Sequence, residues 1–410
     1  MNFYAIIIGT ALVGEYLLGI IADVLNLKTL GAGVPSEFSG IVDSGAYAKS
    51  QDYTRTTTTF GIISSTISLI ATLTFWLAGG FNWLDTIVRG WQLGDLWTGL
   101  VYIGILVLAR STLSLPFSIY STFVIEARFG FNTTTPITFA LDLLKGIALG
   151  IILGGSLLLG VLAFFEYAGT MAWLYCWGAA TLFILVVQFI APTWIMPLFN
   201  KFTPLEDGEL REAILSYAKS VKFSLSDVFV MDGSKRSTKS NAFFTGFGKN
   251  KRIALFDTLI RRHSVSELVA VLAHEIGHYK KKHIIQGMVI SIAHMGVMFY
   301  VLSFFVRTPG LFQAFSMEHI SVYAGLIFFG MLFTPIEFLL SLLMHILSRK
   351  NEFEADRYSA ETYHAPGAMV EALKKLSLHN LSNLTPHPFY VALHYSHPPV
   401  LERIRALDRV

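Results

Sequence analysis

The chain has 410 residues, of which 53% are hydrophobic and 14% charged, and its formal net charge is +3. A soluble domain carries about 25% charged residues, so this composition, with a mean hydropathy of +0.56, excludes an ordinary soluble protein and indicates a membrane protein. The net charge is too small to indicate a nucleic-acid partner, and a single cysteine, Cys176, excludes an internal disulfide.

Seven segments are long and apolar enough to cross a bilayer, which takes roughly 20 apolar residues. They lie at residues 4–25, 60–78, 98–120, 146–165, 170–192, 284–306 and 320–347. Glu337 interrupts the seventh segment near its middle, whereas Glu15 and Arg110 lie in the first and third segments. Charged groups at such depth are costly, so Glu337 indicates a hydrated interior. Glu15 and Arg110 are equally compatible with snorkelling near helix ends.

Two polar segments separate or follow these spans. We divide the chain into residues 1–199 with spans one to five, 200–283 as an α+β segment, 284–347 with spans six and seven, and 348–410 as a helical segment. Within the first polar segment we predict a helix over 210–221, strands over 227–231, 240–247 and 252–256, and turns at 232–234 and 248–250.

The basic residues indicate how the chain is oriented in the membrane. Lys and Arg concentrate in the two polar segments, with Arg261, Arg262 and residues 280–282 beside span ends. The positive-inside rule then predicts that both polar segments are cytoplasmic. An odd number of spans places the N-terminus on the opposite side.

The stretch His274-Glu275-Ile276-Gly277-His278 matches the H-E-x-x-H pattern and ends a run of helical character that begins at Ser266. Positions i and i+4 share one helix face, so both imidazoles reach one metal ion. Glu275 is then placed to polarise a metal-bound water. The pattern is typical of zinc peptidases, although it also occurs on surface helices that bind no metal.

A catalytic zinc site has three protein ligands, and the segment Asn351–Asp356 after the seventh span offers the third. In a helix, Glu352 and Asp356 lie four residues apart on one face, whereas Glu354 points away. We therefore expect Glu352 to bind the metal and Asp356 to accept a hydrogen bond from a ligand imidazole. The sequence thus predicts one Zn²⁺ per chain, held at the end of a transmembrane hairpin.

Several further stretches carry a resemblance to a known family. They read PFSIY at 116–120, FVIE at 123–126, PLFNKF at 197–202, SNAF at 240–243, NKRIALFDTL at 250–259 and HYSHPP at 394–399. With the two metal motifs, they resemble the type I CAAX prenyl proteases, which are integral-membrane zinc metalloendopeptidases. The resemblance runs from about residue 116 to residue 403, and the first hundred residues match mainly in hydropathy.

The resemblance implies an all-α-dominated polytopic fold. About seven transmembrane helices would form a chamber, capped by a small α+β zinc-peptidase domain. It also implies a substrate and a partner: such proteins cut prenylated CAAX proteins or peptides after the modified cysteine and release the C-terminal tripeptide. The expected partners are therefore a prenylated or hydrophobic peptide and the lipid bilayer, and we expect a monomer.

The resemblance also implies roles for individual residues. Asn241, His397 and Arg403 match family positions that hold the peptide backbone and stabilise the tetrahedral intermediate. In the mechanism that follows, zinc lowers the pKa of its bound water to about 7 and Glu275 takes the proton. Glu275 then returns the proton to the leaving amine, while zinc and His397 hold the oxyanion.

Two other functions are compatible with the residues. A membrane quality-control protease of the heat-shock HtpX-like kind would share the zinc chemistry and act on unprenylated substrates. A multispan transporter or receptor with an incidental zinc loop would not be an enzyme. Whatever the function, we interpret His283 and His294 as structural, because they lie near or inside the sixth span. We expect the cytoplasmic membrane as the location in a prokaryote and the endoplasmic reticulum in a eukaryote.

Overall fold

The computed structural model describes residues 2–31, 33–225, 227–245 and 252–410. Within this described part, seven helical stretches are long and apolar enough to cross a membrane. They are Phe3–Lys28, Ser44–Leu77, Asp95–Phe129, Pro136–Tyr167, Gly169–Leu198, His283–Phe305 and Val322–Tyr363. Their number and order match the prediction, and each includes most of the segment predicted from hydropathy.

The first five stretches contain the helices α1, α2 and α4 to α8 and short π-helical turns, and α3 lies between the second and third stretches. The helices are α1 (Phe3–Lys28), α2 (Ser44–Leu77), α3 (Gly80–Gly90), α4 (Asp95–Tyr120), α5 (Ala127–Phe129), α6 (Pro136–Leu149), α7 (Gly155–Tyr167) and α8 (Ala172–Ile190). Pro116 lies inside α4 without ending it, and the π-helical turn Ser121–Glu126 follows. Since proline lacks an N–H, it disturbs the helical hydrogen bonds around it, which accounts for an irregular turn close by.

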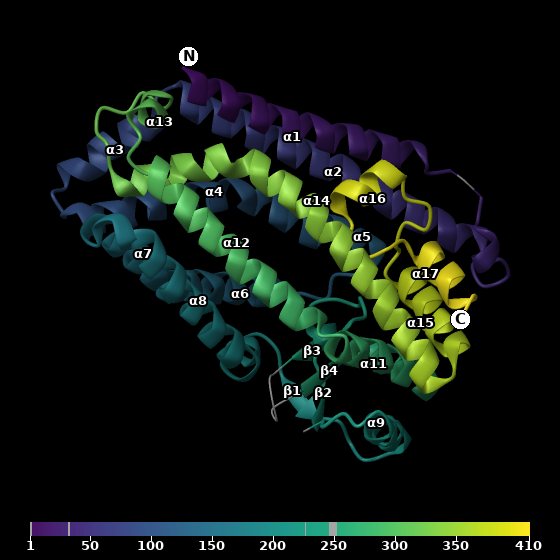
Figure 1. Ribbon diagram of the computed structural model, residues 1–410. Coiled ribbons are helices and arrows are strands. Elements are labelled where there is room, and N and C mark those ends of the chain that lie inside the picture. Colours follow the sequence, from purple (N-terminus) through teal and green to yellow (C-terminus); the bar gives the residue numbers. More distant parts are fainter. Residues whose placement is uncertain (1, 32, 226, 246–251) are drawn as a thin grey trace.

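The last two spans form a hairpin of α12 (His283–Phe305) and α14 (Val322–Tyr363), joined through the short α13 (Pro309–Gln313). Figure 1 shows α14 running from the α13 end of the molecule to the end that holds α11, α15 and α17. It has 42 residues and continues through Pro335 and through residues 347 and 348, where the sequence suggested a boundary between parts. One uninterrupted helix therefore carries both a membrane span and Glu352.

Within that hairpin, Glu337 of α14 has a partner. Its Oε1 lies 3.2 Å from Nε2 of His294 on α12. An ionisable side chain within a span normally pairs with another polar group, so this contact explains how the acidic residue is accommodated between the two helices.

The soluble end contains a four-stranded sheet in the order β1-β2-β4-β3. The strands are β1 (Phe202–Pro204), β2 (Asp227–Met231), β3 (Ala242–Thr245) and β4 (Arg252–Phe256). β2 and β4 are parallel and coincide with predicted strands, whereas β1 and β3 pair antiparallel at the two ends of the sheet. β1 was not predicted, because three residues give too short an alternation to recognise. The predicted turn at 248–250 lies outside the described residues.

Helices cover this sheet and form the rest of the soluble end. They are α9 (Glu209–Ser220), α10 (Asp257–Ile260), α11 (Val265–Lys280), α15 (Pro366–His379), α16 (Pro388–His394) and α17 (Val400–Leu407). Apolar side chains of α9, β2, β4 and α11 share one buried core, with Ile214, Ile253, Leu255 and Leu272 fully enclosed. The H-E-x-x-H helix therefore lies against a rigid layer rather than on an exposed loop.

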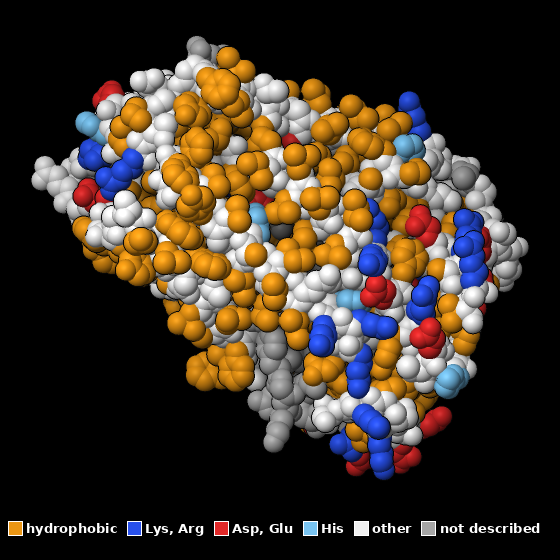
Figure 2. All heavy atoms as spheres, in the orientation of Figure 1, with side chains coloured by type: hydrophobic (Ala, Val, Ile, Leu, Met, Phe, Trp, Pro, Cys, Tyr) orange, Lys and Arg blue, Asp and Glu red, His pale blue; other side chains and the backbone are white. Residues whose placement is uncertain are grey.

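The surface divides in the same way. In Figure 2, hydrophobic side chains cover most of the visible face over the spans, whereas Lys, Arg, Asp and Glu gather around the end that holds α11, α15 and α17. A smaller charged group lies at the opposite end, near α3 and α13. On the spans themselves, large apolar side chains such as Leu182, Phe304 and Leu343 are well exposed, as expected of helices that face lipid.

The start of α11 is fixed by a capping box. Ser264 Oγ accepts from the Glu267 backbone N–H, and the Glu267 carboxylate accepts from the Ser264 N–H.

Further along, α11 packs against α14 at very short range. A Cβ at Gly277 would lie 3.1 Å from Ala355 Cα and 3.2 Å from Ala355 O. Glycine at 277 therefore lets the backbones of the two helices approach each other.

We predict that Gly277→Ala destabilises the protein by about 1–3 kcal/mol, because the added methyl group must push backbone atoms of α14 away. Thermal unfolding of the purified protein in detergent measures the effect. Gly287→Ala on α12 is the matched control, since a Cβ there meets nothing within 4 Å. Equal melting temperatures for the two variants would contradict this account of the helix contact.

Candidate metal centre

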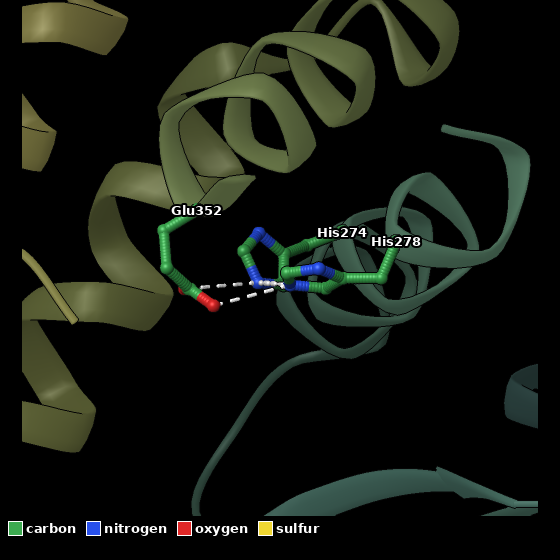
Figure 3. Close-up of side chains that lie close together, drawn as sticks. All are labelled: His274, His278 and Glu352. Carbon is green, nitrogen blue, oxygen red and sulfur yellow. Dashed lines mark hydrogen bonds and ion pairs between the residues drawn. The ribbon is translucent and has the colours of Figure 1, made fainter. Parts of the chain in front are cut away.

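His274 and His278 of α11 face Glu352 of α14 (Figure 3). The Nε2 atoms of the two imidazoles lie 3.1 Å apart. Glu352 Oε2 is 3.4 Å from His274 Nε2, and Oε1 is 3.2 Å from His278 Nε2. The i, i+4 spacing on one helix brings the imidazoles together, and the α11–α14 contact adds the carboxylate.

These three side chains fit a metal ion. Two ligand atoms at about 2.0–2.1 Å from a tetrahedral ion are separated by roughly 3.3 Å, close to the separations of 3.1–3.4 Å between the nitrogen and oxygen atoms of this cluster. Glu352 is 4% exposed, and its Oε2 is buried without a hydrogen-bond partner among the described residues. A buried carboxylate oxygen that makes no hydrogen bond is costly, and a cation at this point would satisfy it.

Behind the cluster lies a buried ion pair. Arg403 of α17 donates from Nε and Nη2 to Asp356 of α14, at 2.8 and 2.6 Å. Asp356 Oδ1 also lies 2.8 Å from His274 Nδ1, the contact that its spacing from Glu352 predicts. The carboxylate thereby orients the imidazole so that Nε2 points towards the cluster.

The guanidinium also approaches the cluster itself. Arg403 Nη1 lies 3.5 Å from Glu352 Oε2, and Nη2 lies 3.4 Å from His274 Nδ1. Arg403 is 9% exposed and Asp356 is 1% exposed, so the two opposite charges compensate each other in a site that excludes water. The contact of Arg403 with the substrate stays a prediction. The observed contacts show that Arg403 also has a structural role, which is to pair with Asp356 and Glu352.

Glu275 lies between the two histidines in α11, close to the same groups. Burial raises the pKa of Glu275, while the neighbouring imidazoles lower it and Glu352 raises it further. A carboxyl group with a raised pKa holds a proton more readily than an exposed one, which suits a group that first accepts a proton and later donates it.

His397 approaches the cluster from the loop between α16 and α17. Its Nε2 lies 3.4 Å from Glu352 Oε1, its Nδ1 lies 2.9 Å from Ser396 Oγ, and its side chain is 64% exposed. Arg349, one turn before Glu352 on α14, donates to the backbone oxygens of Val391 and Tyr395 at 3.3 and 2.7 Å. It thereby holds the end of α16 where the His397 loop begins.

Asn241 takes no part in this network among the described contacts. It immediately precedes β3, its Oδ1 accepts from the Ala242 N–H at 2.9 Å, and its backbone oxygen accepts from Phe256 at 3.1 Å. β3 lies at one end of the sheet, so Asn241 precedes a strand whose outer edge pairs with no other described strand.

Sequence reasoning missed one part of the site. His283 was interpreted as structural and Glu354 as pointing away, yet His283 contacts both His278 and Glu354. The five-residue spacing between His278 and His283 could have drawn attention to this pair. It falls across the boundary between α11 and α12, so helix periodicity does not predict the contact.

Comparisons with known proteins agree with this geometry. A family model described as "CAAX prenyl protease N-terminal, five membrane helices" matches residues 23–201, and the model of peptidase family M48 matches residues 204–410. The chain belongs to the CAAX prenyl protease group of family M48. It is therefore a metalloendopeptidase and a multi-span integral membrane protein.

Relatives in this CAAX prenyl protease group match along nearly the whole chain. "CAAX prenyl protease 1 homolog" of Oryza sativa subsp. japonica is 37% identical over 94% of this chain and 91% of its own. "CAAX prenyl protease 1" of Saccharomyces cerevisiae is 35% identical over 92% and 89%. The crystal structure of S. mikatae Ste24p superposes with a TM-score of 0.94, at 32% identity and complete coverage of both chains.

These matches confirm the predicted fold class, a polytopic helical protein with a small α+β cap, and the predicted enzyme class. They favour the CAAX type over the HtpX-like alternative, because the named relatives and the N-terminal five-helix model are CAAX prenyl proteases. The transporter or receptor alternative is wrong, since the chain is a peptidase.

We predict that Arg403→Met destabilises the protein by about 3–5 kcal/mol, because it leaves the buried carboxylates of Asp356 and Glu352 without their cation. The stability of Arg403→Lys should fall between those of the wild-type protein and Arg403→Met, since an ammonium group keeps the charge but cannot make the bidentate contact. Chemical unfolding in detergent measures both losses.

Arg405→Met is the matched control for this prediction. Arg405 lies on the same helix, is 57% exposed and pairs with Glu37, so its loss should cost less than about 1 kcal/mol. Similar losses for Arg403→Met and Arg405→Met would show that the buried pair contributes nothing special.

Proposed function

We propose that this protein is a zinc endopeptidase that removes the C-terminal tripeptide from prenylated CAAX proteins or peptides. The observation that carries the proposal is the His274, His278 and Glu352 cluster in a chain that aligns almost end to end with proteins named CAAX prenyl protease 1. The substrate is taken from what those relatives are named for, and the chemistry is argued from the residues of this chain.

Zinc is the metal that we propose for the site. Two imidazole nitrogens and one carboxylate oxygen are a donor set that catalytic zinc sites use, with a fourth position left for water or substrate. The set lacks the thiolates of structural zinc sites, and Cys176 is buried among the spans. His274, His278 and Glu352 would hold one Zn²⁺ per chain.

When bound, zinc would lower the pKa of a water molecule and polarise the scissile carbonyl. Glu275 then accepts the proton of the attacking water and donates it to the leaving amine. Its place next to His274 in the chain and its electrostatic interaction with both histidines support this role, because the carboxyl group lies near the cluster without being one of its three members.

His397 and Arg403 are proposed to stabilise negative charge on the substrate. His397 Nε2 lies 3.4 Å from Glu352 on an exposed loop, so a substrate oxygen can reach it. Arg403 presents Nη1 towards the Glu352 carboxylate while its other nitrogens hold Asp356. Donors fixed in this way before the reaction lose little energy in reorganisation when charge develops.

Asn241 is proposed to bind the peptide backbone at the outer edge of β3. An extended peptide can add a strand to such an edge through main-chain hydrogen bonds. The approach to Asn241 is held rigidly: Asn380 accepts from the Ser240 N–H at 3.1 Å and donates to the Ser240 oxygen at 3.2 Å. Thr258 Oγ1 donates to the Lys239 oxygen at 2.9 Å.

We also propose that the soluble end is cytoplasmic, because its basic residues lie beside span ends. The four parts with boundaries at residues 199, 283 and 347 stay a proposal: they separate the segments that we place in the membrane from those that we place in the cytoplasm, and they are not meant as separately folding units. We expect a monomer, and the membrane would be the cytoplasmic membrane in a prokaryote or the endoplasmic reticulum in a eukaryote.

We predict that Glu275→Gln retains bound zinc and loses cleavage of a farnesylated CAAX peptide by at least about 100-fold, because general-base catalysis typically contributes 10²–10⁴-fold. His274→Ala should lose both zinc and cleavage. Metal analysis and peptide hydrolysis on the same purified preparations separate the two effects.

The same assay tests the substrate. The farnesylated peptide should be cut after its modified cysteine, phenanthroline should abolish the reaction, and an unprenylated peptide of the same sequence should be a poorer substrate. Full activity of Glu275→Gln would overturn the assignment of the base. Equal cleavage of both peptides would overturn the prenylated substrate and leave the peptidase chemistry standing.

We predict that Asn380→Ala raises KM for the peptide by roughly five- to tenfold with little change in kcat, because the loss of two hydrogen bonds loosens the chain before Asn241. Steady-state kinetics measure both constants. Asn383→Ala is the control, since Asn383 contacts Asn26 of α1 and not β3. An unchanged KM in Asn380→Ala, or an equal rise in both variants, would argue against a peptide site at this strand.

A further inference from the structure

The second ligand histidine has a neighbour whose function is unassigned. His278 Nδ1 lies 3.0 Å from Nδ1 of His283, the first residue of α12. Nε2 of His283 lies 3.2 Å from Glu354 Oε2 on α14. His283 is 8% exposed, and its ring lies at 72° to that of His278 with centroids 5.2 Å apart.

We propose that His283 and Glu354 form a hydrogen-bonded relay that fixes the ring orientation and tautomer of His278 for metal binding. The inference rests on the proposed metal-ligand role of His278. In this relay His283 is a positioning residue: it contacts neither the metal position nor the substrate and acts through the imidazole of His278.

The positions of the protons follow from the three contacts. A metal needs the lone pair of His278 Nε2, so the ring hydrogen of neutral His278 must be on Nδ1. That N–H can donate to His283 Nδ1 only if His283 carries its own hydrogen on Nε2. His283 Nε2 then donates to the carboxylate of Glu354. Each group has one compatible role, so the chain of contacts selects a single tautomer for both rings.

The relay completes a symmetric pattern around the cluster. Ligand histidines usually donate their second ring N–H to a carboxylate or another acceptor, which orients the ring and raises its basicity. His274 has Asp356 for this purpose, at 2.8 Å. His278 reaches its carboxylate, Glu354, through His283. Both supporting carboxylates come from α14, the helix that also carries Glu352.

The backbone between the two helices supports the same conclusion. Lys282, the residue before His283, has φ of 64°, a left-handed conformation that a non-glycine side chain rarely adopts. Its N–H donates to the Tyr279 oxygen at 3.0 Å, which ends α11 abruptly. The turn brings His283 back beside His278. Unfavourable backbone conformations of this kind cluster at functional sites.

The test is the zinc affinity of the purified full-length protein in detergent, measured by competition with a chromophoric chelator. We expect His283→Ala to weaken zinc binding by about 10- to 100-fold, the usual loss when a residue supporting a ligand histidine is removed. His283→Asn should lose less, because its Oδ1 can take the place of Nδ1 as the acceptor for His278. It cannot restore the contact with Glu354.

A double-mutant comparison tests the second contact. Glu354→Ala alone should weaken zinc binding less than His283→Ala does. In the presence of His283→Ala it should add almost nothing, because the relay is already broken. Full additivity of the two losses would contradict a relay.

His294→Ala is the matched control. His294 lies on the same helix as His283 but pairs with Glu337, so its removal should leave zinc affinity unchanged. Melting temperatures without metal should be similar for His283→Ala and His283→Asn, which separates orientation of the ligand from loss of fold. Wild-type affinity in His283→Ala, or equal losses in the Ala and Asn variants, would overturn the relay. Failure of the wild-type protein to bind zinc would overturn the proposed function together with it.

Discussion

The close contact between α11 and α14 is the constraint on which the site depends. The two histidines are neighbours on one helix, but Glu352 lies 74 residues beyond His278 in the numbering and is separated from it by a membrane hairpin. Only a contact at backbone distance brings a side chain as short as glutamate to both imidazoles. Gly277 provides this contact, because any larger residue would meet the backbone of Ala355. The proposed metal site is thus a product of helix packing as much as of the motif.

A second constraint is electrostatic. Three acidic side chains, Glu275, Glu352 and Asp356, are gathered near two histidines and Arg403, and most of these groups are buried. Buried charges of one sign would repel each other and lose hydration, so the arrangement needs compensation. Arg403 supplies part of it from the C-terminal helix α17, and a bound cation would supply the rest. The last helix of the chain is therefore coupled energetically to the motif in the middle.

The sequence predicts those features that depend on local patterns. Hydropathy locates the seven spans, alternation locates β2 and β4, and i, i+4 spacing pairs His274 with His278 and Glu352 with Asp356. It predicts neither the pairing of β1 nor the contact of His283 with Glu354, because both depend on how separate elements meet. Interpreting Glu354 as pointing away was correct with respect to Glu352. That interpretation overlooked the contact that Glu354 makes with His283 at the start of α12.

The length of α14 has a mechanical consequence. From Val322 to Glu352 the helix extends about 45 Å, at about 1.5 Å per residue. If it pivots at its far end, a tilt of one degree moves Glu352 by roughly 0.8 Å, whereas ligand distances in a metal site tolerate about 0.2 Å. Helices respond to bilayer thickness by tilting. The contact between α11 and α14 at Gly277 restrains Glu352 against such a tilt, so bilayer thickness would act on the proposed metal site through this contact.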